Sequence, residues 1–368
     1  SPMALALPQG GAVVGGTASI SQPDALMTQI NQTSGQAVIN WNGFSIDVNE
    51  LVRFVQPGAD SVALNKVLGA DPSAILGQLI ANGRVFLSNP NGVLFAPGSS
   101  VDVGALLATT FDISNEDFMA GRYDFSQTGG AASVVNKGQI RVADNGFVFL
   151  VAPGVANEGL IVANLGKVVL GSGNSLAMDF DGNKLISYEV SGKVLENVAG
   201  QDGAPLAASV SNTGAIYANG GTVLMTGDAA KDIVSSVVNQ DGIIEAKSLS
   251  SLGGSVKLTG RGEGIVQNKG TIDVSAAEAG AAAGDVSLGG EYAGNFGAIY
   301  ARGATDADGG NVKLESGKMT LVSSSGVIDA SGSDNSSGGT IILLSDNNTA
   351  MSGATIARGG DKGGDEIG

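Results

Sequence analysis

Apolar and polar positions alternate in a repeating pattern from Val134 to the end of the chain. Each repeat reads Asn-x-Gly-x-Ile-x-(Ala/Val) and, after a variable gap, Gly-Gly-x-Val-x-Leu. The anchor glycines are Gly138, Gly159, Gly214, Gly242, Gly270, Gly297 and Gly326. Two residues after each anchor stands an isoleucine: Ile140, Ile161, Ile216, Ile244, Ile272, Ile299 and Ile328. Fixed apolar residues that alternate with variable ones indicate a strand with one buried face.

The spacing of the repeats predicts the fold class. From Gly214 onward the anchors are 27 to 29 residues apart, and each repeat supplies a second alternating strand such as Val256 to Leu258. Two short strands cannot form a core alone. Stacking equivalent positions about 4.8 Å apart turns their apolar rows into a continuous interior. We therefore expect an all-β protein folded as a right-handed parallel β-helix.

An asparagine stands two residues before most anchors, and its amide can hydrogen-bond from coil to coil. The positions are Asn136, Asn157, Asn212, Asn268 and Asn295, with Asn239 one residue early and Ser324 as a replacement. We expect a ladder of stacked amides.

The chain is expected to form one domain with four parts. An N-terminal cap and the first coils occupy residues 8–110, with capping strands in residues 10–60, and further coils occupy residues 111–171. Residues 172–210 lack the repeat, and their two alternating runs flank Asp181-Gly182-Asn183, which predicts a β-hairpin outside the helix. Regular repeats occupy residues 211–368. A new unit begins shortly before Gly368, so we expect a truncated solenoid.

The pattern also predicts one short helix, between Asp71 and Gly83. Asp71-Pro72-Ser73 resembles a helix start, and a C-terminal glycine follows the apolar residues Ile75 and Leu79.

Composition and charge exclude several classes of function. The formal net charge is −16, so the long-range field repels phosphate backbones, and we expect no nucleic-acid partner. Cysteine and histidine are both absent, which excludes disulfides, Cys/His zinc sites and a Ser-His-Asp triad within this chain. We predict a monomer without a metal or cofactor that is not an enzyme. The start at Ser1-Pro2-Met3 carries no signal-peptide pattern, so we expect any export signal to have been removed.

The strongest local motif is Asn89-Pro90-Asn91-Gly92-Val93. Proline presets φ and Asn-Gly accepts positive φ, so the motif by itself indicates a tight turn.

Several segments together resemble the two-partner secretion domain of filamentous-haemagglutinin-type exoproteins, most closely the high-molecular-weight adhesin branch. The similarity spans about residues 8 to 360. It is carried by Val38-Ile39-Asn40-Trp41-Asn42 with Phe44-Ser45-Ile46, by Asn49-Glu50-Leu51-Val52-Arg53-Phe54, by Val85-Phe86-Leu87-Ser88 leading into Asn89 to Val93, and by Asp112-Ile113-Ser114-Asn115-Glu116. The family has an Asn-Pro-Asn-Leu motif where this chain has Asn49-Glu50-Leu51 without the proline.

The resemblance implies the N-terminal secretion-directing domain of a large secreted adhesin from a Gram-negative bacterium. Its partners would be an outer-membrane barrel transporter with periplasmic POTRA modules and the downstream adhesin repeats of the same polypeptide. The protein would pass through the periplasm and outer membrane and be secreted or held at the cell surface. The residues expected to serve transporter recognition or folding nucleation are Asn89, Pro90, Asn91, Gly92, Val93, Asn49, Glu50 and Leu51.

Two other functions remain open at this stage. Glu245 and Asp273 share an outward position on adjacent coils, and two carboxylates about 5 Å apart can act as acid and nucleophile in a polysaccharide-cleaving enzyme. The same position also holds Arg141 and Val162, and no Arg or Lys cluster accompanies the acids in the sequence. Alternatively, the outward column of Tyr217, Glu245, Asp273 and Tyr300 binds a host-cell or matrix carbohydrate.

Overall fold

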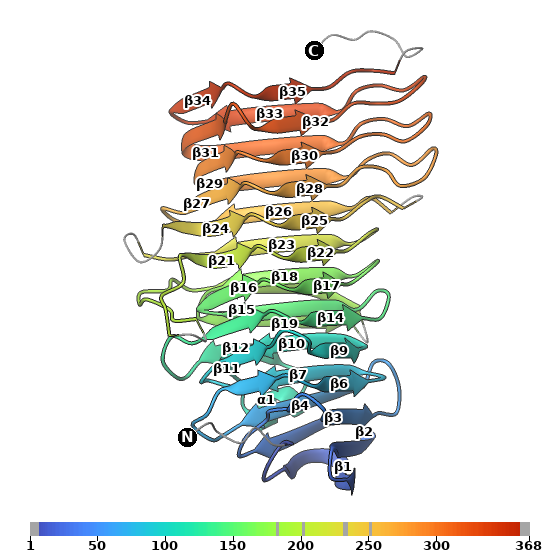
Figure 1. Ribbon diagram of the computed structural model, residues 1–368, viewed down its shortest axis with the longest axis vertical. Helices are drawn as coiled ribbons and strands as arrows, with labels where there is room; N and C mark the ends of the chain where they lie inside the picture. Colours follow the sequence, from blue (N-terminus) through green and yellow to red (C-terminus); the bar gives the residue numbers. More distant parts are fainter. Residues whose placement is uncertain (1–6, 182–183, 201–202, 231–234, 250–251, 361–368) are drawn as a thin grey trace. The chain divides into compact units, whose positions relative to one another are not determined.

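The computed structural model describes residues 7–181, 184–200, 203–230, 235–249 and 252–360. It has two compact units: Ser1–Ile161 with Gly171–Leu206, and Val162–Leu170 with Ala207–Gly368. The boundaries between the units fall within strands β17 (Leu160–Val162) and β18 (Lys167–Ser172). In each unit, short parallel strands stack coil upon coil (Figure 1). The predicted all-β parallel β-helix is confirmed, whereas the predicted part boundaries at 110, 171 and 210 stay a prediction.

Three parallel ladders form the helix of the first unit. One ladder runs through β3 (Leu51–Val55), β6 (Gln78–Ala81), β9 (Ser100–Val103) and β14 (Gln139–Val142). The second runs through β4 (Val62–Val67), β7 (Arg84–Ser88), β10 (Ala105–Thr109) and β15 (Phe147–Ala152). The third runs through β5 (Ser73–Ile75), β8 (Val93–Phe95), β13 (Ser133–Asn136) and β16 (Gly154–Asn157).

Two long antiparallel strands cap the N-terminal end of this helix. β1 (Ala12–Asp24) pairs with β2 (Met27–Trp41), and β2 pairs in parallel with both β3 and β4. The side chains of Trp41 and Phe44 are both buried next to these strands. Their rings pack edge to face, with centroids 5.5 Å apart. The predicted capping strands are therefore confirmed.

The predicted helix between Asp71 and Gly83 is wrong, because the structure has β5 and β6 there. Ile75, Leu79 and Ala81 are buried while Gln78 is exposed, which is a period of two. Apolar residues four positions apart lie on one side of a helix and also on one face of a strand. Parallel pairing of β5 with β8, and of β6 with β3 and β9, stabilises the strand conformation here. The short helix observed is α1 (Asn115–Met119), whose cap is the Ser114 hydroxyl accepting from the Asp117 amide at 2.9 Å.

A small antiparallel sheet lies outside the helix and contains the predicted hairpin. Its four strands are β11 (Phe111–Asp112), β12 (Tyr123–Gln127), β19 (Ser175–Asp181) and β20 (Lys184–Ser191). β19 and β20 pair antiparallel as the predicted hairpin requires, with Leu176 opposite Val190. The expected turn at Gly182 and Asn183 lies outside the described residues. The pairing of this hairpin with β12 and β11 was not foreseen from the sequence.

The small sheet covers an apolar column on the outer surface of the helix. This outer column consists of side chains stacked in register on β2, β4, β7, β10 and β15: Val38, Leu64, Phe86, Leu107 and Phe149. All five are buried. The Phe86 ring packs against Phe118, Tyr123 and Phe125 at centroid distances of 6.2 to 6.4 Å. These helix strands are consequently buried on both faces.

The second unit repeats the predicted coil with little variation. Its strands are β21 (Ala208–Asn212), β22 (Ala215–Tyr217), β23 (Thr222–Gly227), β24 (Ser236–Gln240), β25 (Ile243–Glu245), β26 (Ser255–Gly260), β27 (Ile265–Asn268), β28 (Thr271–Asp273), β29 (Asp285–Asn295), β30 (Ala298–Tyr300), β31 (Asn311–Val322), β32 (Val327–Asp329), β33 (Thr340–Ser345), β34 (Asn348–Met351) and β35 (Ala354–Ile356). The isoleucines of the repeat stack in one file: Ile216, Ile244, Ile272, Ile299 and Ile328. Each is fully buried, as the period-two pattern predicted.

Buried amides form the predicted ladder. In the first unit, Asn136 Nδ2 donates to Asn157 Oδ1 at 2.7 Å, and in the second, Asn268 Nδ2 donates to Asn295 Oδ1 at 2.7 Å. Where the sequence pattern pointed to Asn239, the ladder position is taken by Gln240, whose Oε1 accepts from Asn212 at 2.6 Å. The longer glutamine side chain fills the place of an asparagine because the amide group, not the residue type, makes the bond.

Candidate functional site

Asn89 to Val93 form the corner between β7 and β8, in the second coil, and one buried amide holds it. The Gly92 amide donates to the Asn89 carbonyl at 3.0 Å, which closes a β-turn with Pro90 in its second position. Asn89 Nδ2 donates to the Asp71 carbonyl and to Ser73 Oγ, both at 3.0 Å. Asn89 Oδ1 accepts from the Asn91 amide at 2.9 Å. Asn89 is fully buried, so its side chain ties this corner to the coil below.

The remaining contacts of this corner also join coils. Asn91 Nδ2 donates to the Gly69 carbonyl at 2.9 Å, and the Ser73 amide donates to the Gly92 carbonyl at 3.0 Å. Gly92 has φ 112°, a conformation that disfavours any side chain. Upward, the Asn89 amide donates to the Thr109 carbonyl at 3.0 Å. The corner therefore bonds to the coils on both sides of it.

Asn49 to Leu51 form a different, exposed corner in the first coil. The Glu50 carboxylate accepts from the Asp47 amide at 2.7 Å, and the Leu51 amide donates to the Leu26 carbonyl at 2.8 Å. The carboxylate thereby closes a turn that lacks proline. Asn49 is exposed, and beside it Val48 and Leu26 are 63% and 52% exposed. The structure therefore does not bring the two motifs together. The Asn49 corner exposes Asn49 and Val48, whereas at the other corner Asn89 is buried and Asn91 is exposed.

The outward column predicted in the second unit exists as a register. Tyr217, Glu245, Asp273 and Tyr300 are successive partners on parallel strands, and Asp329 follows Tyr300. The Arg302 guanidinium lies over the Tyr300 ring, 4.1 Å from its centroid, and its Nε pairs with Asp329 Oδ2 at 2.6 Å. One face of the Tyr300 ring is therefore occupied. Carbohydrate binding by the column stays a prediction.

A single basic side chain, Lys247, lies between the two acids. Lys247 Nζ lies 3.2 Å from Glu245 Oε2 and 3.3 Å from Asp273 Oδ2. Burial opposes the charge of Lys247, but Asp273 and Glu245 outweigh it and raise the pKa of the amine. A glycosidase pair needs one carboxyl that stays protonated. Here both carboxylates are paired with the same ammonium ion.

The Arg302–Asp329 pair predicts a small acid-dependent contribution to stability. Burial raises the pKa of Asp329, but hydrogen bonds from Ser331 and Arg302 outweigh it and lower the pKa below 3.8. A lowered pKa in the folded state contributes stability that is present above pH 3.8 and is lost as the pH falls through the folded value. Because the pair is partly exposed, we expect Arg302→Met to cost below about 1 kcal/mol at pH 7.

Thermal denaturation at pH 7 and at pH 3 measures this effect. The variant should differ from the parent at pH 7 and approach it at pH 3, while Lys257→Met, on an outward position of β26, should change neither value. An equal loss for Arg302→Met at both pH values would contradict the ionic origin.

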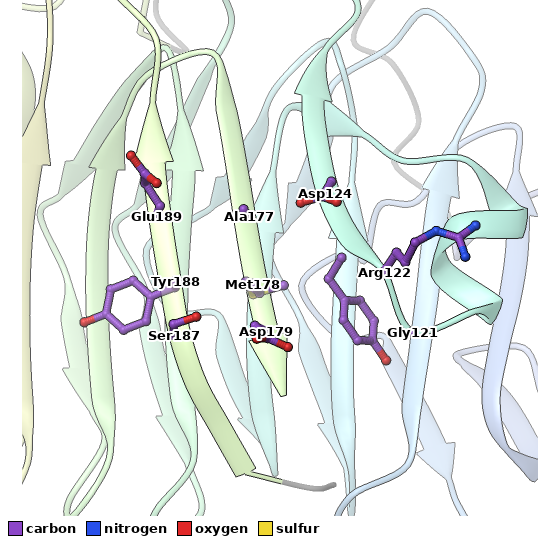
Figure 2. A pocket seen from close by; sticks show the side chains of 10 residues that line it. Gly121, Arg122, Asp124, Ala177, Met178, Asp179, Ser187, Tyr188 and Glu189 are labelled. Carbon is purple, nitrogen blue, oxygen red and sulfur yellow. The ribbon is translucent and has the colours of Figure 1, made fainter. Parts of the chain in front are cut away.

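The outer surface of the small sheet carries a depression of about 440 Å³ that the sequence did not reveal. Asp124, Ala177 and Glu189 are partners across three strands and form one row of its lining, with Asp179 on the same surface (Figure 2). The nearby Arg122 guanidinium forms an ion pair with Asp117 Oδ1 at 2.6 Å. The only sequence signal for this surface was the alternation within the hairpin.

Two kinds of feature are missing from the described residues. Among them, no three His, Cys, Asp or Glu residues are grouped so that they could hold a metal ion. None of the helices in the described part of the chain is long and apolar enough to cross a bilayer. Hydrogen bonding at coil corners and stacking of coils are the properties that the geometry displays.

Comparison with known proteins agrees with these properties. The chain is 37% identical over 204 residues to a heme/hemopexin-binding protein of Haemophilus influenzae, which covers 54% of this chain and 22% of that protein. A second Haemophilus influenzae heme/hemopexin-binding protein is 38% identical over 131 residues, or 36% of this chain and 14% of that protein. The chain thus spans about a fifth of the length of the first relative.

A solved structure shares the fold. The secretion domain of HMW1 from Haemophilus influenzae superimposes with a TM-score of 0.67 and 25% identity, covering 95% of this chain and 100% of that domain. The model of the TPS secretion domain family matches residues 4–274, which is more than half of the chain. The protein therefore belongs to the TPS secretion domain family, as the secretion domain of a two-partner exoprotein that a cognate transporter exports across the Gram-negative outer membrane.

Proposed function

We propose that this chain directs the secretion of a large surface adhesin and nucleates the folding of its β-helix outside the cell. The transporter's periplasmic POTRA modules recognise the unfolded chain, and the first coils to emerge then fold and remain outside. The observation that carries this proposal is the fully buried Asn89, whose amide bonds to the coil below while its backbone bonds to the coil above.

Stacking supplies a direction for export without ATP. Each coil of the second unit buries its own apolar set on the preceding coil, as Val266, Ile272 and Val274 do. Burial of one such side chain contributes about 1.5–3 kcal/mol before the entropy of ordering is subtracted. Because a stacked coil must be unfolded before it can slide back, every added coil opposes return into the transporter.

The two corners are proposed to have separate roles. At the Asn89 corner, Asn89 itself is buried and the backbone is bonded to the coils on both sides, which suits nucleation of folding. The Asn49 corner exposes Asn49, Val48 and Leu26, and its turn is closed by its own Glu50. A change at Asn49 or Val48 therefore leaves the packed interior intact, and we assign recognition to this corner.

Secretion and refolding assays of the same variants test this division. With the transporter co-expressed, we expect Asn89→Ala to abolish secretion and to slow refolding of the purified chain. Asn49→Ala with Val48→Asp should reduce the amount secreted at least about tenfold while the purified chain refolds normally, a loss of about 1.4 kcal/mol in recognition. Asn335→Ala, on a surface loop of the second unit, is the matched control.

The experiment tests the nucleation role and the recognition role independently. Normal refolding and secretion of Asn89→Ala would remove the nucleation role of the buried corner. Normal secretion of the Asn49 and Val48 double variant would remove recognition by the exposed corner. Immunoblots of the culture medium measure secretion, and far-ultraviolet circular dichroism after dilution from urea measures refolding.

The activity of the whole protein has a second candidate. The relatives are named for binding heme and hemopexin, and the identity to one of them is 37%. If the parent protein of this chain shares that activity, cells displaying it should capture heme–hemopexin from solution. If it is an adhesin, as we propose, the same cells should attach to host-cell monolayers, and cells lacking the transporter should do neither.

A further inference from the structure

The Lys66 amine lies in a cluster of three polar groups to which the proposed function assigns no role. This cluster, Lys66 with Asp112 and Asn115, lies where β4 approaches the segment that leads into α1. Lys66 Nζ lies 2.9 Å from Asp112 Oδ1 and 3.3 Å from Asn115 Oδ1, and it donates to the Ile113 carbonyl at 2.7 Å. An amine, a carboxyl group and a carboxamide thus meet although Lys66 and Asn115 are 49 residues apart in the chain.

The surroundings of the amine are largely dry. The Lys66 side chain is only 11% exposed, and β4 is buried along its whole length. Phe111 and Phe118, on either side of the segment, are fully buried. A proton that crosses from Nζ to Asp112 Oδ1 leaves a neutral amine beside a carboxylic acid, which are the forms that amide exchange requires.

We propose that Lys66 and Asn115 become joined by an amide bond once the domain has folded. The Nζ lone pair attacks Asn115 Cγ, and the carboxylic acid of Asp112 stabilises the oxygen on which negative charge develops. Asp112 then delivers the proton it took from Nζ to the departing nitrogen, and the Cγ–Nδ2 bond breaks. The carboxylate regenerated on Asp112 accepts the second proton from Nζ, which leaves a neutral amide. One C–N bond forms, one C–N bond breaks and ammonia leaves, so that no oxidant or cofactor is needed.

Such a bond is compatible with passage through a transporter in the unfolded state. The chain has no cysteine and hence no disulfide. The amide link forms only when β4 and the start of α1 are brought together by folding, so it cannot close a loop before export. Once formed, it joins the coil of β4 to the segment between β11 and α1, and thereby ties the helix to the small outer sheet.

Intact mass measurement tests the bond on the complete folded chain. We expect a mass about 17 Da below the sequence mass, the loss of one ammonia, and a peptide map in which Lys66 and Asn115 occur in one linked fragment. The same chain kept unfolded in urea should show the full sequence mass. Lys66→Met and Asn115→Ala should show their own full masses, whereas Lys137→Met, which removes an exposed lysine paired with Glu158, should keep the loss.

Two further variants keep the test decisive. Asn115→Asp should lose about 18 Da as water instead of ammonia, because the carboxyl carbon remains in place. Asp112→Asn should fold yet link more slowly, since it removes the proton carrier. Succinimide formation at Asn91-Gly92 also releases ammonia, but it would persist in Lys66→Met. A folded parent chain at the full sequence mass, or a loss that survives Lys66→Met, overturns the proposal.

Discussion

Replacing Phe86 with alanine is expected to lower the free energy of unfolding by about 3–5 kcal/mol. Phe86 is fully buried on the outer surface of β7, and its ring contacts Phe118, Tyr123, Phe125 and Phe147 at centroid distances of 6.1 to 6.4 Å. The change leaves a cavity between the helix and the small sheet, which cannot collapse because strands border it on both sides. Urea denaturation followed by circular dichroism measures the loss.

Leu68→Ala is the matched control for Phe86→Ala, because Leu68 lies just beyond β4 and is 63% exposed. Its free energy of unfolding should stay within about 0.5 kcal/mol of the parent. The Phe86 variant should also lose near-ultraviolet dichroism from the surrounding rings. A Phe86 variant as stable as the Leu68 variant would show that the small sheet contributes nothing to the stability of the helix.

Gly270→Ala is expected to lower the free energy of unfolding by about 3 kcal/mol or more, because the added atom has no room. A Cβ at Gly270 would lie 2.1 Å from the Gly242 carbonyl oxygen of the coil below. That oxygen belongs to the backbone and cannot turn aside. A Cβ at Gly297 would likewise lie 2.1 Å from the Gly270 carbonyl oxygen. A backbone shift that removed the clash at Gly270 would therefore disturb the contact with the next coil.

Gly35→Ala controls for the general effect of adding a methyl group. Nothing lies within 4 Å of a Cβ at Gly35, so this variant should be unchanged or slightly more stable. With the transporter present, Gly270→Ala should also lower the yield of secreted protein, since one coil would stack poorly. Equal stability of the Gly270 and Gly35 variants would show that the coils can separate at this corner without cost.

Local chemistry was sufficient to predict the coil of the repeats. A strand with one buried face leaves a period of two in its own residues, and Ile272 shows this pattern whatever its neighbours are. The anchor glycines were also visible, because a place where two backbones touch admits no other residue. The hairpin of β19 and β20 was predictable for the same reason, since each strand alternates and a turn separates the two.

Burial on a second face depended on tertiary contacts. The apolar run from Phe147 to Val151 has no alternation, because Phe149 packs under the small sheet while its neighbours face the helix interior. Ile75 and Leu79 fitted a helix as well as a strand until their parallel neighbours were known. Local spacing cannot separate these cases when the partner strands lie some 20 residues away in the chain.

The candidate sites divide in the same way. The sequence by itself determined the repeating coil, the tight turn at Asn89 and the outward column, because each depends on residues close together in the chain. Only the tertiary structure decided that Asn89 is buried while Asn49 is exposed, that Lys247 pairs with both acids, and that Lys66 meets Asn115. Burial of a side chain, and contacts between residues far apart in the sequence, depend on which coil lies above or below. The local sequence pattern does not encode that arrangement.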